Sequence, residues 1–308
     1  LYGTEVDPEL VELVIEKRIS DINKVSASKR EDIAKGFIKG FLKGFSEGNY
    51  TQHRYLKLTS AIVRTDALNI LKMLKNKDLR NKISPDGQLI RTTNLPSNAY
   101  MYPYILENFP NRFYEGRLAF EGVRSYYNGV EYTLKSPEHY TYPVDLNKSE
   151  CAEIFIDPQG RYADFWYDKV YTRVWNTFNV DYRTIDNKWI ETIANTDMTV
   201  FRKDLYEDLN EYIKDMKKNK TIVECDRVVL EPSAMYFYNG MYYIRCYVHY
   251  RIVSTNTKTR YSTDDLLVGL NKTPYNSVLF SNTGIVELFD YKLGEWVDGI
   301  FDICLSSP

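Results

Sequence analysis

Apolar residues recur with helical spacing at the start of the chain. Asp7-Pro8-Glu9 is typical of a helix start, because Asp caps free backbone N–H groups and Pro fits the first helical position. The pattern predicts an N-terminal helix that begins at Pro8 and runs to about Val25. Its apolar stripe is formed by Val11, Ile15, Ile19 and Ile22.

Residues 28–47 predict a second helix, in which glycine–phenylalanine pairs recur every four residues. In a helix this period places each residue type on its own slowly drifting stripe. Each internal glycine costs about 1 kcal/mol of helix propensity, so we expect another backbone to approach the stripe closely. Three interpretations stay open: packing inside a domain, a partner helix in an oligomer, or a basic amphipathic helix on a membrane surface. The candidate interaction residues are Gly36, Phe37, Gly40, Phe41, Gly44 and Phe45.

A third helix is predicted over residues 65–82, and turn chemistry at Ser84-Pro85-Asp86-Gly87 ends it. Its leucines fall nearly in phase, at Leu68, Leu71, Leu74 and Leu79. The first hairpin is predicted over 126–132, because Asn128-Gly129 tolerates the positive φ angles of a tight turn. Residues 136–160 contain Pro137, Pro143, Pro158 and Gly160, and we place a domain boundary there.

The second half begins with helices and ends with strands. Trp166, Val170, Val174 and Phe178 follow at steps of four, and a further helix is predicted over 199–218. An Asn239-Gly240 hairpin pairs Tyr236 with Tyr243 and Phe237 with Tyr242, and the same register places Cys246 opposite Ser233. Strands are predicted at 221–230, 234–238, 241–254, 277–280, 284–291 and 295–305.

The two hairpins resemble each other in sequence, since residues 126–134 echo residues 237–245. The echo indicates either a tandem duplication or the chance recurrence of a common hairpin. We expect an α+β protein with an N-terminal helix over 1–28 and two α+β domains, over 29–140 and 158–308, with curved antiparallel sheets. This element order resembles the NTF2-like superfamily, and tandem copies resemble the extracytoplasmic domains of VirB8-like conjugation proteins. The resemblance implies an NTF2-like second domain.

Composition excludes several classes of protein. The 40 Lys and Arg against 42 Asp and Glu give a net charge of −2, which argues against a generic nucleic-acid binder. No apolar run is long enough to span a membrane as a helix.

The chain begins with Leu1, so we expect a processed or truncated product that has lost an upstream segment. The four cysteines form no CxxC pair, which favours buried free thiols.

Motifs for chemistry are weak. The three histidines form no metal-ligand pair, and no nucleotide-binding loop or nucleophile elbow is present. We interpret Glu224 and Asp226 as solvated charges, Asp197 as a helix cap, and the SxxK match at Ser26–Lys29 as chance. The sequence therefore predicts no catalytic residue, no cofactor and no metal site.

Tyrosine is the compositional anomaly, with 27 residues in the chain. Tyrosine is enriched at interfaces because it buries a large area and keeps one polar group. The tyrosines around the second hairpin form either a contact surface or a cross-strand ladder in a core. These candidate interaction residues are Tyr236, Tyr238, Tyr242 and Tyr243.

These patterns favour a non-catalytic structural subunit of a large multi-protein assembly, either a phage connector or tail component or an envelope part of a conjugation or secretion machine. Its expected partners are other protein subunits in a homo-oligomer, without sequence-specific nucleic acid. Membrane contact is expected only through a missing N-terminal anchor or the 33–47 helix. The expected location is a virion or the extracytoplasmic face of a bacterial envelope. The alternative is a ligand- or glycan-binding module with aromatic residues in an NTF2-like pocket, and a third hypothesis is a hydrolase that uses two carboxylates.

Overall fold

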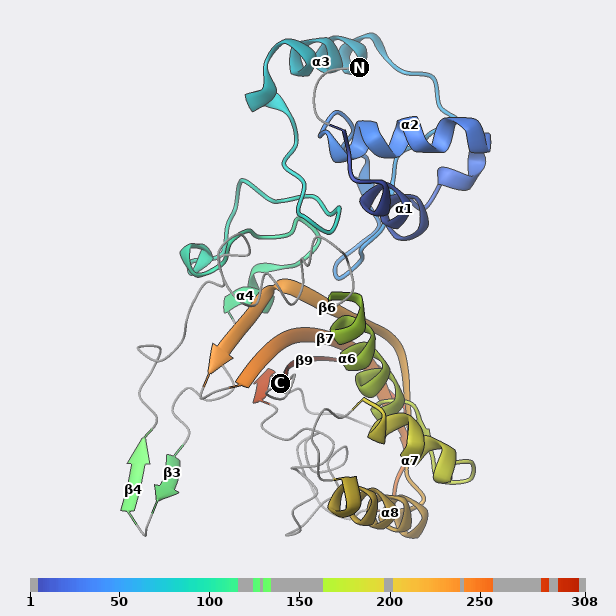
Figure 1. Ribbon diagram of the computed structural model, residues 1–308, viewed down its shortest axis with the longest axis vertical. Helices are drawn as coiled ribbons and strands as arrows, with labels where there is room; N and C mark the ends of the chain where they lie inside the picture. The colour runs from blue at the N-terminus through green and yellow to red at the C-terminus, as the bar shows by residue number, and fades with distance from the viewer. Residues whose placement is uncertain are drawn as a thin grey trace. The chain divides into compact units, whose positions relative to one another are not determined.

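The protein divides into two units, described here from a computed structural model (Figure 1). Unit 1 holds Leu1–Ala99 and Tyr104–Tyr114, and unit 2 holds Tyr100–Pro103 and Glu115–Pro308. The predicted boundary segment, 136–160, lies outside the described residues, so it stays a prediction. The structure describes residues 5–115, 124–127, 130–133, 163–196, 202–238, 241–256, 284–287 and 293–304.

The mixed α+β class is confirmed, with N-terminal helices followed by antiparallel sheets. The strands are less curved than expected, because no sheet in the described residues is strongly curled.

The first helix of unit 1 starts where the sequence predicts and ends early. Helix α1 spans Pro8–Lys17, and the Asp7 carboxylate accepts a hydrogen bond of 3.0 Å from the backbone N–H of Glu9. The prediction that it continues to Val25 is wrong. The backbone of Arg18 and Ser20 pairs instead with that of Arg54, at 2.9 and 3.0 Å, and only a short 3₁₀ turn, η1 (Ile22–Lys24), follows. A distant segment therefore ends the helix.

The second helix, α2, spans Ala27–Ile38, so the predicted helix over 28–47 is wrong beyond Ile38. Gly40 adopts φ +76°, and its N–H donates to the carbonyl of Phe37 at 2.8 Å while that of Phe41 donates to Gly36 at 3.0 Å. This pair of bonds is a Schellman motif, which ends a helix at a glycine in the left-handed region. The spacing of four reflects a helix end followed by turns.

The rest of unit 1 is short elements around two apolar clusters. Strand β1 (Phe45–Ser46) pairs with β2 (Arg54–Tyr55), and α3 (Arg64–Lys75) leads into the 3₁₀ turn η2 (Lys77–Leu79). A further 3₁₀ turn, η3 (Ala99–Met101), of which only Ala99 belongs to unit 1, precedes α4 (Asn111–Glu115), which belongs to unit 1 up to Tyr114. One cluster joins α1 and α2, and the other is aromatic. Their fully buried members include Val14, Ala34, Phe37, Phe109, Phe113 and Tyr114.

In the described residues, unit 2 begins with a two-stranded hairpin that is followed by helices. Strands β3 (Arg124–Tyr127) and β4 (Val130–Thr133) pair, which confirms the first predicted hairpin. Helices α6 (Ala163–Thr177), α7 (Asn187–Ala194) and α8 (Arg202–Asn219) follow. The predicted apolar stripes are buried at the positions described: Val170, Val174 and Phe178 in one, and Leu205, Leu209, Ile213 and Met216 in the other.

The main sheet of unit 2 is antiparallel. Long strands β6 (Ile222–Tyr238) and β7 (Met241–Ser254) run side by side, followed by β9 (Val297–Cys304) and β8 (Gly284–Glu287), and the two-residue β5 (Val180–Asp181) adds to the β6 edge (Figure 1). Phe178, just after α6, packs on Tyr250 of β7 and Phe301 of β9, with ring centroids 4.9 and 5.2 Å away. The predicted strand at 277–280 lies outside the described residues.

The β6–β7 hairpin has the predicted register near its turn and a different one further along. Tyr236 pairs with Tyr243 and Phe237 with Tyr242, as predicted. Cys246 lies opposite Leu230, so its predicted pairing with Ser233 is wrong, because the register shifts between Glu231 and Met235. Pro232 falls in this bulge, and Pro is confined to such positions because it has no N–H to donate. The two predicted strands on either side are one bulged strand.

Candidate functional site

The glycine–phenylalanine residues do not form one surface. Phe37 is fully buried in the cluster of α1 and α2, so it serves the core. Phe41 lies under the guanidinium of Arg80, and Phe45, which is 54% exposed, lies under the ammonium of Lys57, at 4.5 and 4.0 Å from the ring centroids. The three rings thus occupy three different surroundings, and the segment 33–47 offers no amphipathic helix of that length for a membrane.

Two of the three glycines are approached closely, as predicted, but at turns rather than along a helix. A Cβ added to Gly40 would lie 2.1 Å from the carbonyl oxygen of Asn81, whose own N–H and side-chain amide donate to the Gly40 carbonyl at 3.0 and 2.9 Å. A Cβ on Gly44 would lie 2.5 Å from a methyl of Leu56. A Cβ on Gly36, inside α2, meets only ordinary contacts, at 3.6 Å. Gly40 and Gly44 therefore fix the path of unit 1.

The four tyrosines of the second hairpin lie on the paired ends of β6 and β7. Their side chains lie outside the described part of the structure. The interpretation of Tyr236, Tyr238, Tyr242 and Tyr243 as a contact surface stays a prediction.

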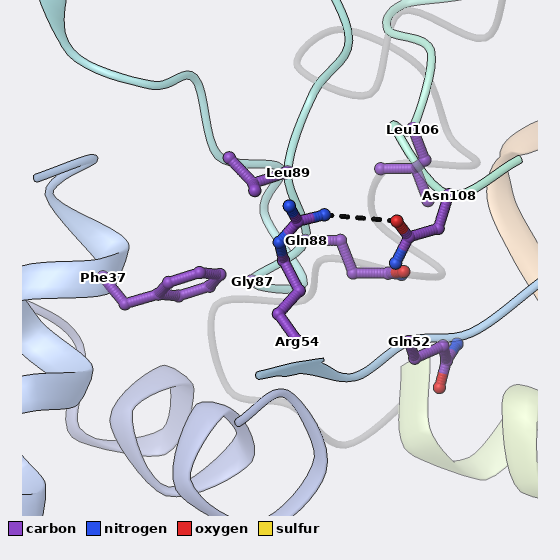
Figure 2. Close-up of a pocket in the computed structure, with 8 residues that line it drawn as sticks. All are labelled: Phe37, Gln52, Arg54, Gly87, Gln88, Leu89, Leu106 and Asn108. Atoms are coloured by element: carbon purple, nitrogen blue, oxygen red, sulfur yellow. Dashed lines mark hydrogen bonds between the residues drawn. The ribbon is translucent and has the colours of Figure 1, made fainter. Parts of the chain in front are cut away.

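A small polar pocket lies in unit 1 beside Arg54 (Figure 2). Arg54 is 4% exposed, and its guanidinium donates to the carbonyls of Lys43 and Gly44 at 2.6 and 3.1 Å and to the side chain of Asn108 at 3.2 Å. It also lies 3.3 Å from the Glu107 carboxylate. Burial lowers the pKa of this guanidinium, while the Glu107 charge raises it. Arg54 thus ties β2 to two other segments of unit 1.

The residues that line this pocket have a structural role, and the pocket itself is too small for a substrate. It leaves about 10 Å³ for the centre of a water molecule, which is room for roughly one water. The amide of Asn108 donates to the Thr51 carbonyl at 2.8 Å, and that of Gln88 donates to the Asp86 carboxylate at 2.6 Å. Figure 2 shows Arg54 between Leu89 and Asn108, its guanidinium pointing to the Asn108 oxygen. The polar side chains around the pocket are hydrogen-bonded to neighbouring groups of unit 1, and the bonds of Asn108 connect segments that are distant in sequence.

Two carboxylates flank an arginine inside the sheet of unit 2. Arg245 binds Asp302 with bonds of 2.7 and 2.9 Å, and Glu231 lies opposite Arg245 on the next strand. Each of the three is at most 1% exposed. A general acid or base must reach its substrate, and these carboxylates are out of reach of solvent in this structure. The buried group of Glu231, Arg245 and Asp302 therefore fits a structural role better than the active site of a hydrolase.

The tryptophans whose side chains are described each stack on a neighbouring ring. Trp189 stacks on Tyr212 at 5.2 Å, and Trp175 stacks on Tyr171 at 5.9 Å. Trp296 is 39% exposed and stacks on His249, with ring centroids 4.8 Å apart.

Trp296 also lies beside a histidine–carboxylate hydrogen bond and an arginine–carboxylate ion pair that the sequence did not indicate. Asp226 approaches His249 at 2.6 Å and Glu224 approaches Arg251 at 2.6 Å, so these carboxylates are paired rather than simply solvated. Glu224 lies opposite Arg251 in the register of β6 and β7, whereas Asp226 falls in the shift between Cys225 and Arg227, next to the Arg227–His249 pair. Nothing in the sequence marks this shift.

Two of the cysteines are free thiols, as expected. Cys225 and Cys246 are both buried, and neither forms a disulfide. Burial raises the pKa of the Cys225 thiol to about 12 and that of Cys246 well above its ordinary value. Both thiols are therefore protonated and unreactive at neutral pH.

Helix α3 is the surface that the sequence analysis did not anticipate. Its leucines fall nearly in phase along the sequence, yet none of the 12 residues of α3 is buried. Leu68 and Leu71 are 48% and 54% exposed, and Ile62 and Val63 just before the helix are 62% and 58% exposed. In Figure 1 α3 lies away from α1 and α2. An apolar surface of this kind usually marks a contact with something else.

The apolar residues of α3 lie among positive charges. Leu68 is four residues from both Arg64 and Lys72, and Leu71 is four residues before Lys75, so on a helix these cations border the two leucines. Between residues 62 and 82 there are six Lys and Arg residues against two Asp residues. The surface formed by Ile62, Val63, Arg64, Leu68, Leu71, Lys72 and Lys75 is called the α3 surface below.

Neither a metal centre nor a membrane-crossing helix is found among the described residues. No group of three or more His, Cys, Asp or Glu side chains there is placed to hold a metal ion. No helix in that part of the chain is long and apolar enough to cross a bilayer. Comparisons with known protein families, curated proteins and solved structures give no match for the chain.

Proposed function

We propose that the protein is a non-catalytic structural subunit of a larger assembly, attached to another component of it through the α3 surface. One observation carries this proposal. Helix α3 has an apolar side that its own unit leaves uncovered, although α1 and α2 in the same unit bury theirs. Exposed aliphatic side chains cost free energy in water, and a contact that covers them recovers it.

The polar groups of the described residues support the same proposal. The pocket at Arg54 and the buried group at Arg245 both consist of side chains bound to one another inside the fold. Catalysis needs groups that are positioned against a substrate, and these are positioned against their neighbours. They are better suited to holding a rigid shape.

The finer assignment of unit 2 as an NTF2-like domain of a VirB8-like envelope protein belongs to this proposal. The helices α6 to α8 before a long antiparallel sheet support it. The weak curl of the sheet argues against a deep cone-shaped pocket, and so against the alternative of a ligand- or glycan-binding module. A phage connector or tail component is equally compatible with the elements.

Light scattering on the purified full chain tests the proposal. A subunit that assembles with its own kind is expected to show a molar mass that rises with concentration to a defined multiple of 36.2 kDa. A strict monomer at all concentrations, in the absence of any other component, would contradict self-assembly.

A further inference from the structure

We propose that the α3 surface binds an anionic lipid bilayer, with α3 lying in the plane of the headgroups. The inference rests on the proposed function, because it names the component to which α3 attaches. It differs from the sequence-based expectation in its location: the segment 33–47 is not one helix, whereas α3 is a regular helix from Arg64 to Lys75.

The shape of the surface fits a membrane interface. Interfacial helices carry an apolar side that enters the boundary between headgroups and acyl chains, with Lys and Arg along its border. Leu68 and Leu71 supply the apolar side, and Ile62 and Val63 directly precede the helix; all four are about half exposed or more. Four aliphatic side chains that enter the boundary are removed from water, which is the apolar contribution to binding.

The charges distinguish a bilayer from a protein partner. Protein interfaces are depleted in Lys at their centre, whereas an anionic membrane attracts each nearby Lys or Arg. Arg64, Lys72 and Lys75 border the two leucines and have long aliphatic stems. Such stems lie along an apolar surface while the charged ends reach outward, here to lipid phosphates. The α3 surface therefore complements an anionic bilayer in two ways: its aliphatic side chains match the acyl boundary, and its cations match the lipid phosphates.

Nucleic acid fits the surface less well. Single-stranded nucleic acid is bound by aromatic rings that stack on bases and by cations along the backbone. The α3 surface presents Ile, Val and Leu instead of rings. Its aliphatic side chains would gain nothing from phosphates, so the cations alone would carry the binding.

Vesicle co-sedimentation with the full chain tests the inference. The probe is phosphatidylcholine vesicles containing phosphatidylserine, compared with vesicles of phosphatidylcholine alone. The test variant is Leu68→Gln with Leu71→Gln, and the matched control is Thr65→Gln with Asn69→Gln. Both pairs place two glutamines at exposed positions of α3 without changing its charge. Far-UV circular dichroism confirms that each variant keeps its helices.

The expected result is binding to the anionic vesicles that is weakened by salt, falls about tenfold or more in L68Q/L71Q, and is kept within about twofold in T65Q/N69Q. Equal binding by the two variants, or no binding of the natural chain to anionic vesicles, would overturn the inference.

Light scattering without lipid separates this failure from failure of the proposed function. If L68Q/L71Q lowers the molar mass of the assembly while vesicles have no effect, the α3 surface binds a second copy of the chain. The membrane inference is then wrong and the proposed function holds. If the chain is a strict monomer that binds no vesicles, the membrane inference and self-assembly are both wrong.

Discussion

Helices α1 and α3 have similar apolar patterns in sequence, but the apolar side chains of α1 are buried and those of α3 are exposed. In α1, Val11 and Val14 are 5% and 0% exposed, packed against α2. In α3, Leu68 and Leu71 are about half exposed, and no residue of the helix is buried. A helical apolar stripe predicts that a helix forms and that its apolar side is buried against another element. The stripe does not indicate whether that element belongs to the same chain or to a partner.

The polar sides of the two helices also differ. The exposed acidic residues of α1 are Glu9, Glu12 and Glu16, whereas α3 carries Arg64, Lys72 and Lys75 around its leucines. Unit 1 thus exposes a mainly acidic helix and a mainly basic one. The apolar surface that stays uncovered is on the basic helix, which is why an anionic surface is the partner that we infer.

The largest contrast is expected from truncating one apolar side chain in each region. Phe37 is fully buried beneath α1, so Phe37→Ala should destabilise unit 1 by about 3–5 kcal/mol through lost burial and a cavity. Leu71→Ala should change stability by no more than about 0.5 kcal/mol, because Leu71 is 54% exposed. Hydrogen exchange of the α2 amides, measured by mass spectrometry, reports the local stability in both variants. Similar exchange in the two variants would mean that the regions do not differ as described.

The next contrast concerns two arginines. Arg54→Lys keeps the charge but loses the forked geometry that reaches the carbonyls of Lys43 and Gly44 and the side chain of Asn108. Buried acceptors left without donors should cost about 2–3 kcal/mol in total. Arg64→Lys on the exposed surface of α3 is the control and should cost almost nothing. Denaturant unfolding checks both, and a stable Arg54→Lys variant would show that these bonds are dispensable.

Local patterns were the predictable part of the fold. The start of α1 at Asp7-Pro8 and the turn-proximal register of the β6–β7 hairpin are confirmed, since each depends on residues within a few positions. Partners distant in sequence decided the rest. The end of α1 depends on Arg54, and the register beyond Glu231 depends on a bulge at Pro232. The candidate site was missed for the same reason, because the leucines of α3 look like any core stripe until the packing is known.

The glycine repeat shows how one pattern fits two structures. Glycine every fourth residue agrees with a small-residue stripe on a helix, and it agrees equally with a Schellman end at Gly40 followed by a turn at Gly44. Propensity favours the second structure, because a helix that ends does not bear the cost of further internal glycines.

Substitution of two of these glycines separates the packed helix from its turn. Gly40→Ala should destabilise unit 1 by about 2 kcal/mol, because Ala is strained at φ +76° and its Cβ would meet the Asn81 carbonyl. Gly36→Ala should be neutral or stabilising by up to about 1 kcal/mol, since this position is helical and has room. Thermal unfolding of both variants measures the difference. A helix continuous to residue 47 would make both substitutions stabilising.

The smallest expected effect is the most informative about α3. Leu68→Gln with Leu71→Gln should change the free energy of unfolding by no more than about 0.5 kcal/mol, because Leu and Gln have similar helix propensities and both positions are exposed. The same replacement at Val11 and Val14 of α1 would bury two amides and should unfold that region. Denaturant unfolding without lipid measures both. A loss of more than about 1.5 kcal/mol in the α3 variant would mean that the chain covers its own leucines in solution. The α3 surface would then be core, and both the attachment role and the membrane inference would lose the observation that carries them.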